Sequence, residues 1–293
     1  MYLENVSIPP IEIIRDRLTE QDYLDLKNSG LTDEQIVQNG HFSITDKKSA
    51  YQLTGINHRG LCFRYYDPSG SPYKSNGGKD FYRMKPRDWK ENTSQQIDIL
   101  DDPPKYLTEK DGGCKPYFSA LYPHWKIALK RTKTTLYITE GEKKADCLCG
   151  HGKAAIGLSG VWGWMDKQGR TGEYDLPAPQ EVEDDEEAQE QIGKLETSRV
   201  LPELAEIDWK YRRVVLCFDS DLTQKKPVKQ ALKQLAVWLT KQGAEPEILL
   251  LPTEIDGSKN GADDLIVRHG ITAFEILDHF TFSALTYQKK IPL

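Results

Sequence analysis

LYITEGE (Leu136–Glu142) and VVLCFDSD (Val214–Asp221) decide the fold of this chain. Each begins as a short apolar run without polar alternation, which is typical of a strand buried on both faces of a parallel sheet. AAIGL (Ala154–Leu158) and EILLL (Glu247–Leu251) are similar runs, and Pro227–Gln242 has the apolar stripe of a helix. Strands that alternate with helices predict an α/β fold, a parallel sheet with right-handed crossovers.

Acidic residues follow two of these strands directly. Glu140 comes after the first run, and Asp219 and Asp221 come after the second. Ligands of parallel sheets bind beyond the carboxyl ends of the strands, so these acids are expected to lie together. Carboxylates that crowd in this way need a cation between them, and all-oxygen sites suit Mg²⁺ or Mn²⁺. Asp263 and Asp264, in KNGADDL, either join this cluster or serve as first-turn charges of a helix.

The first part of the chain predicts a helical segment over residues 1–48. LTEQDYLDLKNSG and LTDEQIVQNG each begin with Thr (Thr19, Thr32) and end on Gly (Gly30, Gly40), a combination that favours a capped helical hairpin. Such a pair either packs as a plain structural unit or reads DNA, and neither helix has a basic face.

Residues 49–133 predict a β-rich subdomain. Short aromatic and β-branched runs alternate there with turns such as Asp67–Gly70. Basic residues and aromatic residues are interleaved along this stretch, which fits a surface that follows phosphates and stacks bases. A solvated sheet face with its aromatic residues in the core fits equally well.

Composition limits the possible functions. The chain has 293 residues, 38% hydrophobic and 29% charged, and no apolar run long enough to span a bilayer, so a membrane role is excluded. The N-terminal residues lack the pattern of a secretory signal, so a cytoplasmic protein is expected. With 39 Lys and Arg against 45 Asp and Glu, the net charge is -6, and binding of nucleic acid requires a local basic surface. The five cysteines lack the spacing of a zinc knuckle or a disulfide framework.

An acidic insertion interrupts the α/β pattern at about residues 166–206. It includes PAPQEVEDDEEAQEQ and has almost no apolar content, so a solvated loop is expected. A DNA mimic or a partner-binding tail is the alternative. The α/β region therefore covers residues 134–293, with this insertion inside it.

The order of these motifs resembles the Toprim superfamily, which includes bacterial primases, topoisomerases and several nucleases. The matching stretches are ITEGEKKADCL (Ile138–Leu148), AIGLSG (Ala155–Gly160), VVLCFDSD and KNGADDLI (Lys259–Ile266). They are most similar to Toprim domains of plasmid and phage primase-like proteins. The resemblance implies that Glu140 acts as a general acid or base or faces the metal, and that Asp219 and Asp221 hold Mg²⁺.

A weaker resemblance reaches upstream, where RGLCFRYYDPSGSPYKSNGGKDFYRM is similar to the β-rich stretch before Toprim in bacterial primases. It implies contacts with a single-stranded DNA or RNA template and with nucleotides. The candidate residues for these contacts are Arg59, Arg64, Lys79, Arg83 and Lys105. Lys259, in KNGADDLI, is a further candidate for contact with nucleic acid or a nucleotide.

Two departures from the family pattern bear on function. Many Toprim domains have an acid four residues after the motif glutamate, where this chain has Lys144. One helical turn beyond Glu140, Lys144 either reaches the acidic cluster and competes with a second cation or is a solvated surface lysine. The zinc module of bacterial primases and a Walker helicase motif are missing from the sequence, so unwinding is unnecessary or comes from a separate helicase or a replication or defence partner.

Three functions remain open at this point. The first is primase-like nucleotidyl transfer in the replication of a mobile element, with Mg²⁺ neutralising a triphosphate. The second is a Toprim nuclease of DNA or RNA, with Glu140 assisting water or the leaving oxygen. The third is a nucleic-acid-binding or assembly protein with a decayed site, which Lys144 favours and the intact acids oppose. Topoisomerase activity is not expected, because strand passage needs a nucleophilic tyrosine on a separate large domain and a gate that a chain of this length does not build.

Overall fold

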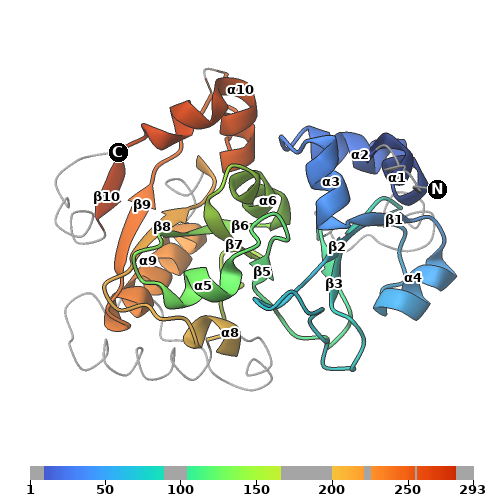
Figure 1. Ribbon diagram of the computed structural model, residues 1–293, viewed down its shortest axis with the longest axis horizontal. Coiled ribbons are helices and arrows are strands. Elements are labelled where there is room, and N and C mark those ends of the chain that lie inside the picture. The colour runs from blue at the N-terminus through green and yellow to red at the C-terminus, as the bar shows by residue number, and fades with distance from the viewer. Residues whose placement is uncertain (1–9, 89–103, 166–199, 221–225, 255, 282–293) are drawn as a thin grey trace, which may run out of the picture. The chain divides into compact units, whose positions relative to one another are not determined.

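The computed structural model describes residues 10–88, 104–165, 200–220, 226–254 and 256–281. Asp221 and most of the acidic insertion, residues 166–199, lie outside the described residues. The chain forms two compact units, Met1–Gly112 and Gly113–Leu293, coloured blue to teal and green to red in Figure 1. We describe each unit by itself.

The first unit begins with capped helices. Thr19 Oγ1 accepts a hydrogen bond from Asp22 N, and Thr32 forms a capping box with Gln35. Gly40 ends the next helix in the left-handed conformation, at φ 71°. These details confirm the helical hairpin predicted from the sequence. The helices of this unit are α1 (Pro10–Arg17), α2 (Glu20–Lys27), α3 (Asp33–Asn39) and α4 (Lys47–Thr54).

A four-stranded antiparallel sheet follows, in the order β1-β2-β3-β4. Its strands are β1 (Phe42–Ile44), β2 (Gly60–Arg64), β3 (Tyr82–Pro86) and β4 (Leu107–Thr108). Cys62 and Met84 pack with Ala50 of α4 in a small core on this sheet. The predicted turn after β2 is present, because Gly70 N donates to Asp67 O at 2.9 Å.

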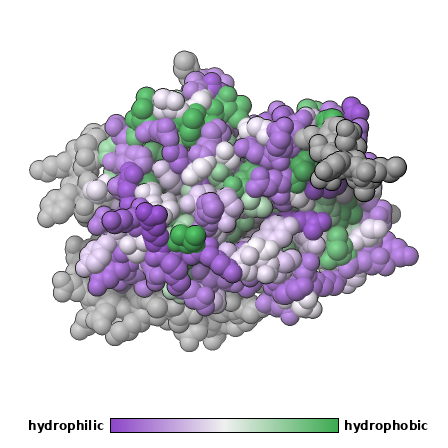
Figure 2. Space-filling model, in the orientation of Figure 1, coloured by the Kyte–Doolittle hydropathy of each residue, from purple (hydrophilic) through white to green (hydrophobic). Residues whose placement is uncertain are grey.

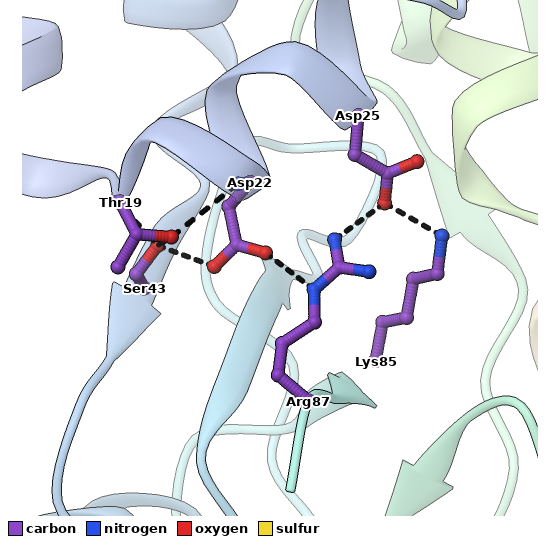
Figure 3. A network of polar contacts seen from close by, with 6 residues as sticks. All are labelled: Thr19, Asp22, Asp25, Ser43, Lys85 and Arg87. Carbon is purple, nitrogen blue, oxygen red and sulfur yellow. Dashed lines mark hydrogen bonds and ion pairs between the residues drawn. The ribbon is translucent and has the colours of Figure 1, made fainter.

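Ion pairs join the helices to this sheet (Figure 3). Asp22 of α2 is 1% exposed and accepts from Arg87 Nε at 2.7 Å and from Ser43 Oγ at 2.5 Å. Asp25 accepts from Arg87 Nη2 at 2.7 Å and from Lys85 Nζ at 2.6 Å. A buried carboxylate needs such partners, so the helices and the strands depend on each other. The boundary that we placed at residue 48 thus falls inside one compact unit.

The second unit has a six-stranded sheet in the order β10-β9-β8-β6-β7-β5. The four inner strands are parallel, and β5 and β10 pair antiparallel at the edges. The inner strands coincide with the four apolar runs within two residues, so the predicted α/β fold is confirmed. The strands are β5 (Tyr117–Phe118), β6 (Leu136–Glu140), β7 (Ala154–Leu158), β8 (Arg213–Cys217), β9 (Glu245–Leu249) and β10 (His279–Thr281). We had expected β5 in the β-rich subdomain, but it extends this sheet instead.

The crossovers of this sheet run in opposite directions. From β6 the chain passes through α6 (Glu142–Gly150) to β7, and from β8 through α9 (Lys226–Lys241) to β9 on the other side. Right-handed crossovers therefore place α6 and α9 on opposite faces, and β6 and β8 flank the topological switch point. α10 (Ala262–Glu275) packs beside α6 (Figure 1). The remaining helices are α5 (Trp125–Lys130) and α8 (Pro202–Ala205).

Arg212 is fully buried at the start of β8. Its Nη1 donates to Ala128 O and Thr134 O, and its Nη2 donates to Leu129 O, each at 2.9 Å. Burial lowers the pKa of this guanidinium, although Asp208 opposes the shift. Arg212 thereby binds two carbonyls at the end of α5, where a helix leaves its last carbonyls without partners, and one carbonyl in the segment after it.

The surface shows no large apolar area on the face in Figure 2, where apolar side chains occur in small separate patches. The exposed large apolar residues are scattered along the described chain: Leu24, Tyr51, Leu53, Ile127, Tyr211, Val267 and Ile276. The five cysteines are free and buried, which agrees with core thiols. No helix in the described part of the chain is long and apolar enough to cross a membrane.

Candidate functional site

Glu140 and Asp219 lie at the switch point of the second sheet. Thr139 of β6 is in register with Cys217 of β8, so Glu140 ends one strand and Asp219 follows its parallel neighbour by two residues. Gly141 turns the chain into α6 at φ 93°, and a Cβ there would meet nothing within 4 Å. The backbone therefore leaves the strand sharply and keeps open space beside Glu140.

Two lysines hold the Asp219 carboxylate. Lys144 Nζ lies 3.1 Å from Oδ1, an ion pair that lacks hydrogen-bond geometry. Lys259 Nζ donates a hydrogen bond to Oδ2, also at 3.1 Å. Ammonium groups thus supply here the countercharge that we expected from a divalent cation. Lys144 is therefore part of the acidic site, and the alternative of a solvated surface lysine does not hold.

The charge on Lys144 is stabilised by several acids. Burial alone would lower the pKa of this ammonium, but Asp219, Asp263 and Glu140 together raise it above the ordinary value for lysine. Lys144 is thus a fixed positive charge among these acids. The sequence placed Lys144 beside Glu140, and the structure adds that its direct partner is Asp219.

Asp263 and Asp264 have different environments. Asp264 Oδ2 accepts a hydrogen bond from Gly261 N at 3.0 Å and so caps the start of α10 from its third residue. Asp263 is 6% exposed, and its Oδ1 is buried without a hydrogen-bond partner in the described structure. Asp264 therefore has the helix-capping role that the sequence left open for one of the two, and Asp263 faces the acidic site.

Gly261 provides the space in which Lys144 reaches this site. A methyl group on Gly261 would lie 2.4 Å from Lys144 Cε and 2.7 Å from Asp263 Oδ1. Both distances are shorter than van der Waals contact. Gly261 is needed for the space that it leaves and not for its backbone conformation, because any residue adopts its φ of -93°.

Asn260 was missed by the sequence analysis. It is 1% exposed and exchanges two hydrogen bonds with Ser220, from Ser220 N to Asn260 O and from Asn260 N to Ser220 Oγ, both at 2.9 Å. Its Nδ2 donates to Pro252 O and to Glu254 Oε1. Asn260 thus ties the loop before α10 to the end of β8 and positions Lys259 next to Asp219. The sequence shows only an Asn-Gly pair, which is typical of any turn.

The carboxylates of the site suit a hard cation such as Mg²⁺. Asp219 and Asp263 offer oxygen ligands, and the buried Oδ1 of Asp263 has no hydrogen-bond donor among the described residues. Within the described ranges, no three His, Cys, Asp or Glu side chains form a group that could hold a metal ion. Asp221, the third predicted ligand, lies outside those ranges.

The basic candidates of the first unit have intramolecular partners. Arg64 Nε donates to Gly40 O at 2.9 Å, and its guanidinium lies over the Phe42 ring. Lys79 donates to Tyr51 O. Arg64 thus has a structural role at the end of α3.

The other basic candidates lie at or near the strands of this sheet. Arg59 N donates to Asp88 Oδ2 at 3.3 Å. Arg83 on β3 lies 4.7 Å above the Tyr106 ring, a stacked guanidinium with an aromatic partner. Lys105 is exposed just before β4. Contact of these residues with a template stays a prediction.

The sequence profile of a family described as "Domain of unknown function (DUF3854)" matches residues 124–273. The chain belongs to the DUF3854 family. The matched residues include every site residue of the second unit named above, from Glu140 to Asp264. The DUF3854 region thus contains the four parallel strands and the acidic site, whereas the edge strands β5 and β10 lie outside it.

Two known proteins are similar to this DUF3854 chain. An uncharacterized protein of Picosynechococcus sp. (SYNPCC7002_B0001) is 31% identical over 151 residues, which are 51% of this chain and 13% of that protein. The crystal structure of the Aquifex aeolicus primase (zinc binding and RNA polymerase domains) matches 95% of this chain and 64% of its own, with a TM-score of 0.52 and 13% identity. At that identity the likeness is one of fold, so the DUF3854 chain has a primase-like fold.

Proposed function

We propose that this protein is a Mg²⁺-dependent enzyme acting on nucleic-acid phosphodiesters, by primase-like nucleotidyl transfer. The observation that carries this proposal is the placement of Glu140 and Asp219 at the carboxyl ends of β6 and β8, on either side of the switch point. Ligands bind at such points in open α/β sheets. The primase-like fold supports the same function.

The residues of the site would have different roles in this reaction. Asp219 and Asp263, with Asp221, would hold Mg²⁺, which supplies charge neutralisation for a nucleotide triphosphate. Glu140 would accept or donate a proton at the reacting oxygen. Lys144 and Lys259 bring positive charge to the same place. Arg83 and Lys105 in the first unit would contact the phosphates of a single-stranded template, and a separate helicase would supply unwinding.

Incubation with single-stranded DNA, NTPs or dNTPs, and Mg²⁺ or Mn²⁺ tests this proposal. The wild type should make short labelled oligomers, and Glu140→Gln should lower the rate at least about 100-fold, as expected for loss of a general acid or base. Asp219→Asn should have a similar effect. Glu245→Gln, an exposed change on β9 of the same unit, is the control and should leave the rate unchanged.

A catalytically decayed nucleic-acid-binding protein is the second candidate. One observation favours it, namely that Asp219 already has two ammonium partners. If the protein binds single-stranded DNA but neither incorporates nucleotides nor cleaves the DNA, with Mg²⁺ or with Mn²⁺, that result would support this candidate and contradict our proposal. Shortening of the template that depends on Glu140, without incorporation, would indicate a nuclease at the same site.

A further inference from the structure

The two lysines on Asp219 differ in how firmly they are held. Lys144 belongs to the first turn of α6, its side chain is 21% exposed, and its stem passes against Gly261. Three carboxylates favour its charge. The Lys259 side chain is 51% exposed and comes from the loop before α10. An ion pair so exposed to water contributes little, about 0.2–1 kcal/mol.

The backbone of Lys259 cannot follow its side chain away from the site. The neighbouring Asn260 is fixed to Ser220 and Pro252 by hydrogen bonds of 2.9 Å. A Lys259 side chain that leaves Asp219 therefore remains anchored beside the acids. Its ammonium stays close enough to meet any anion that enters the same place.

We infer that Lys259 is an exchangeable cation of this site and Lys144 a permanent one. When a divalent cation binds Asp219, Lys259 leaves Oδ2 and becomes available to a phosphate of the substrate, whereas Lys144 stays on Oδ1. Metal binding is thereby coupled to phosphate binding without any movement of the backbone. This inference rests on the proposed function, because it requires that Asp219 binds a metal.

The coupling is tested first by calorimetric titration with Mn²⁺. Lys259→Ala and Lys259→Gln should bind Mn²⁺ about two- to fivefold more tightly than the wild type, because the metal no longer displaces an ammonium. Lys130→Ala is the matched control, since Lys130 is an exposed lysine paired with Asp208 in the same unit. Lys130→Ala should bind Mn²⁺ like the wild type.

The second test follows the lysine ammonium groups directly by nitrogen NMR, with assignment from Lys144→Arg and Lys259→Arg. Without metal, both ammonium signals should show an ion-paired state. Addition of Mg²⁺ should break the pair between Lys259 and Asp219, which changes the Lys259 signal, and leave the Lys144 signal ion-paired. Loss of the Lys144 pair with retention of the Lys259 pair would overturn the assignment.

The third test measures binding of a single-stranded oligonucleotide against NaCl concentration. With Mg²⁺ present, Lys259→Ala should reduce the slope of log K against log salt by about 0.7, the value for one phosphate contact on single strands. Without Mg²⁺ the slope should not change, because Asp219 then holds Lys259. Lys130→Ala should change the slope equally, if at all, in both conditions.

The outcomes separate this inference from the proposed function. If the wild type binds no Mn²⁺, the metal site and the inference both fail. If the wild type and both Lys259 variants bind Mn²⁺ with equal affinity, the metal site is supported, but the inference that the metal displaces Lys259 from Asp219 is wrong. If Lys259→Ala changes the salt slope equally with and without Mg²⁺, release of Lys259 to the substrate is wrong.

Discussion

At the scale of single residues, Gly261 explains how a lysine reaches a site built from acids. The stem of Lys144 passes where any larger residue at position 261 would place its Cβ. The absence of a side chain at position 261 therefore determines where the ammonium group of Lys144, on α6, can lie. The ion pair between Lys144 and Asp219 can form because Gly261 has no Cβ in the path of the Lys144 side chain.

Gly261→Ala should lower the free energy of unfolding by about 1–3 kcal/mol, the usual cost of overpacking. The methyl group would push Lys144 Cε from its place and weaken its pair with Asp219. Urea denaturation measures this cost in the wild type and in Lys144→Ala. In Lys144→Ala the cost should fall, because only the contact with Asp263 Oδ1 and the small preference of a helix N-terminus for Gly over Ala then remain. An equal cost in both proteins would refute this explanation.

The sequence predicts part of this site. Glu140 and Asp219 could be located because acids that follow apolar strands are visible in one chain. Lys144 could be placed near Glu140 by helical spacing, but its pairing with Asp219 could not, since that depends on how β6 and β8 align. The role of Asn260 depends on hydrogen bonds to Ser220 and Pro252, which no spacing reveals.

At the scale of elements, Glu247 joins three strands of the second sheet. Arg213 of β8 donates to its two carboxylate oxygens, from Nε to Oε1 at 2.9 Å and from Nη2 to Oε2 at 2.7 Å. His279 of β10 lies 2.9 Å from Oε2 through Nδ1. The hydrogen bond from Arg213 holds the pKa of Glu247 below its ordinary value, although burial opposes the shift. The carboxylate thus connects β8 and β10 through β9.

Glu247→Gln should lower the free energy of unfolding by about 1 kcal/mol at pH 7. Because the folded pKa is depressed, the contribution of Glu247 is complete above the unfolded pKa of about 4.3. It is lost as the pH falls through the lower folded pKa. Urea denaturation from pH 7 to pH 3 should therefore show the two proteins converging at the acidic end. Glu245→Gln on the same strand should show no such convergence, and a gap that stays constant with pH would contradict the assignment.

The inner strands were predictable from their apolar runs and α9 from its apolar stripe, but the edges of the sheet were not. β5 has two residues and β10 has three, so neither gives a periodic signal. Tyr117 of β5 is fixed by tertiary contact, since its hydroxyl donates to the buried Asp146 of α6 at 2.7 Å. Such an element is defined by its partner rather than by its own sequence.

At the scale of the whole molecule, the acidic site belongs to one of the two units. Glu140, Lys144, Asp219, Lys259 and Asp263 all lie between Gly113 and Leu293. That unit has its own sheet with helices on both faces. Its stability and its metal binding should not require the first unit.

Residues 113–293 expressed alone should unfold in one cooperative thermal transition. Mg²⁺ at millimolar concentration should raise its melting temperature as much as that of the full chain, because a ligand of the folded state stabilises by mass action. Circular dichroism measures both quantities. Asp219→Asn should abolish the rise in both proteins. A piece that unfolds without cooperativity, or that gains nothing from Mg²⁺ when the full chain does, would show that the first unit is required.

The buried Arg212 has a consequence for how this chain is made. The carbonyls that it binds at Thr134 and Ala128 lie 78 and 84 residues earlier in the chain, and β8 can pair with β6 only after that stretch has been made. A ribosome that adds about 5–20 residues each second needs roughly 4–16 seconds to translate such a stretch. During that interval the nascent chain carries β6 with one hydrogen-bonding edge open. Protection of that edge by a chaperone therefore matters most before Arg212 is synthesised.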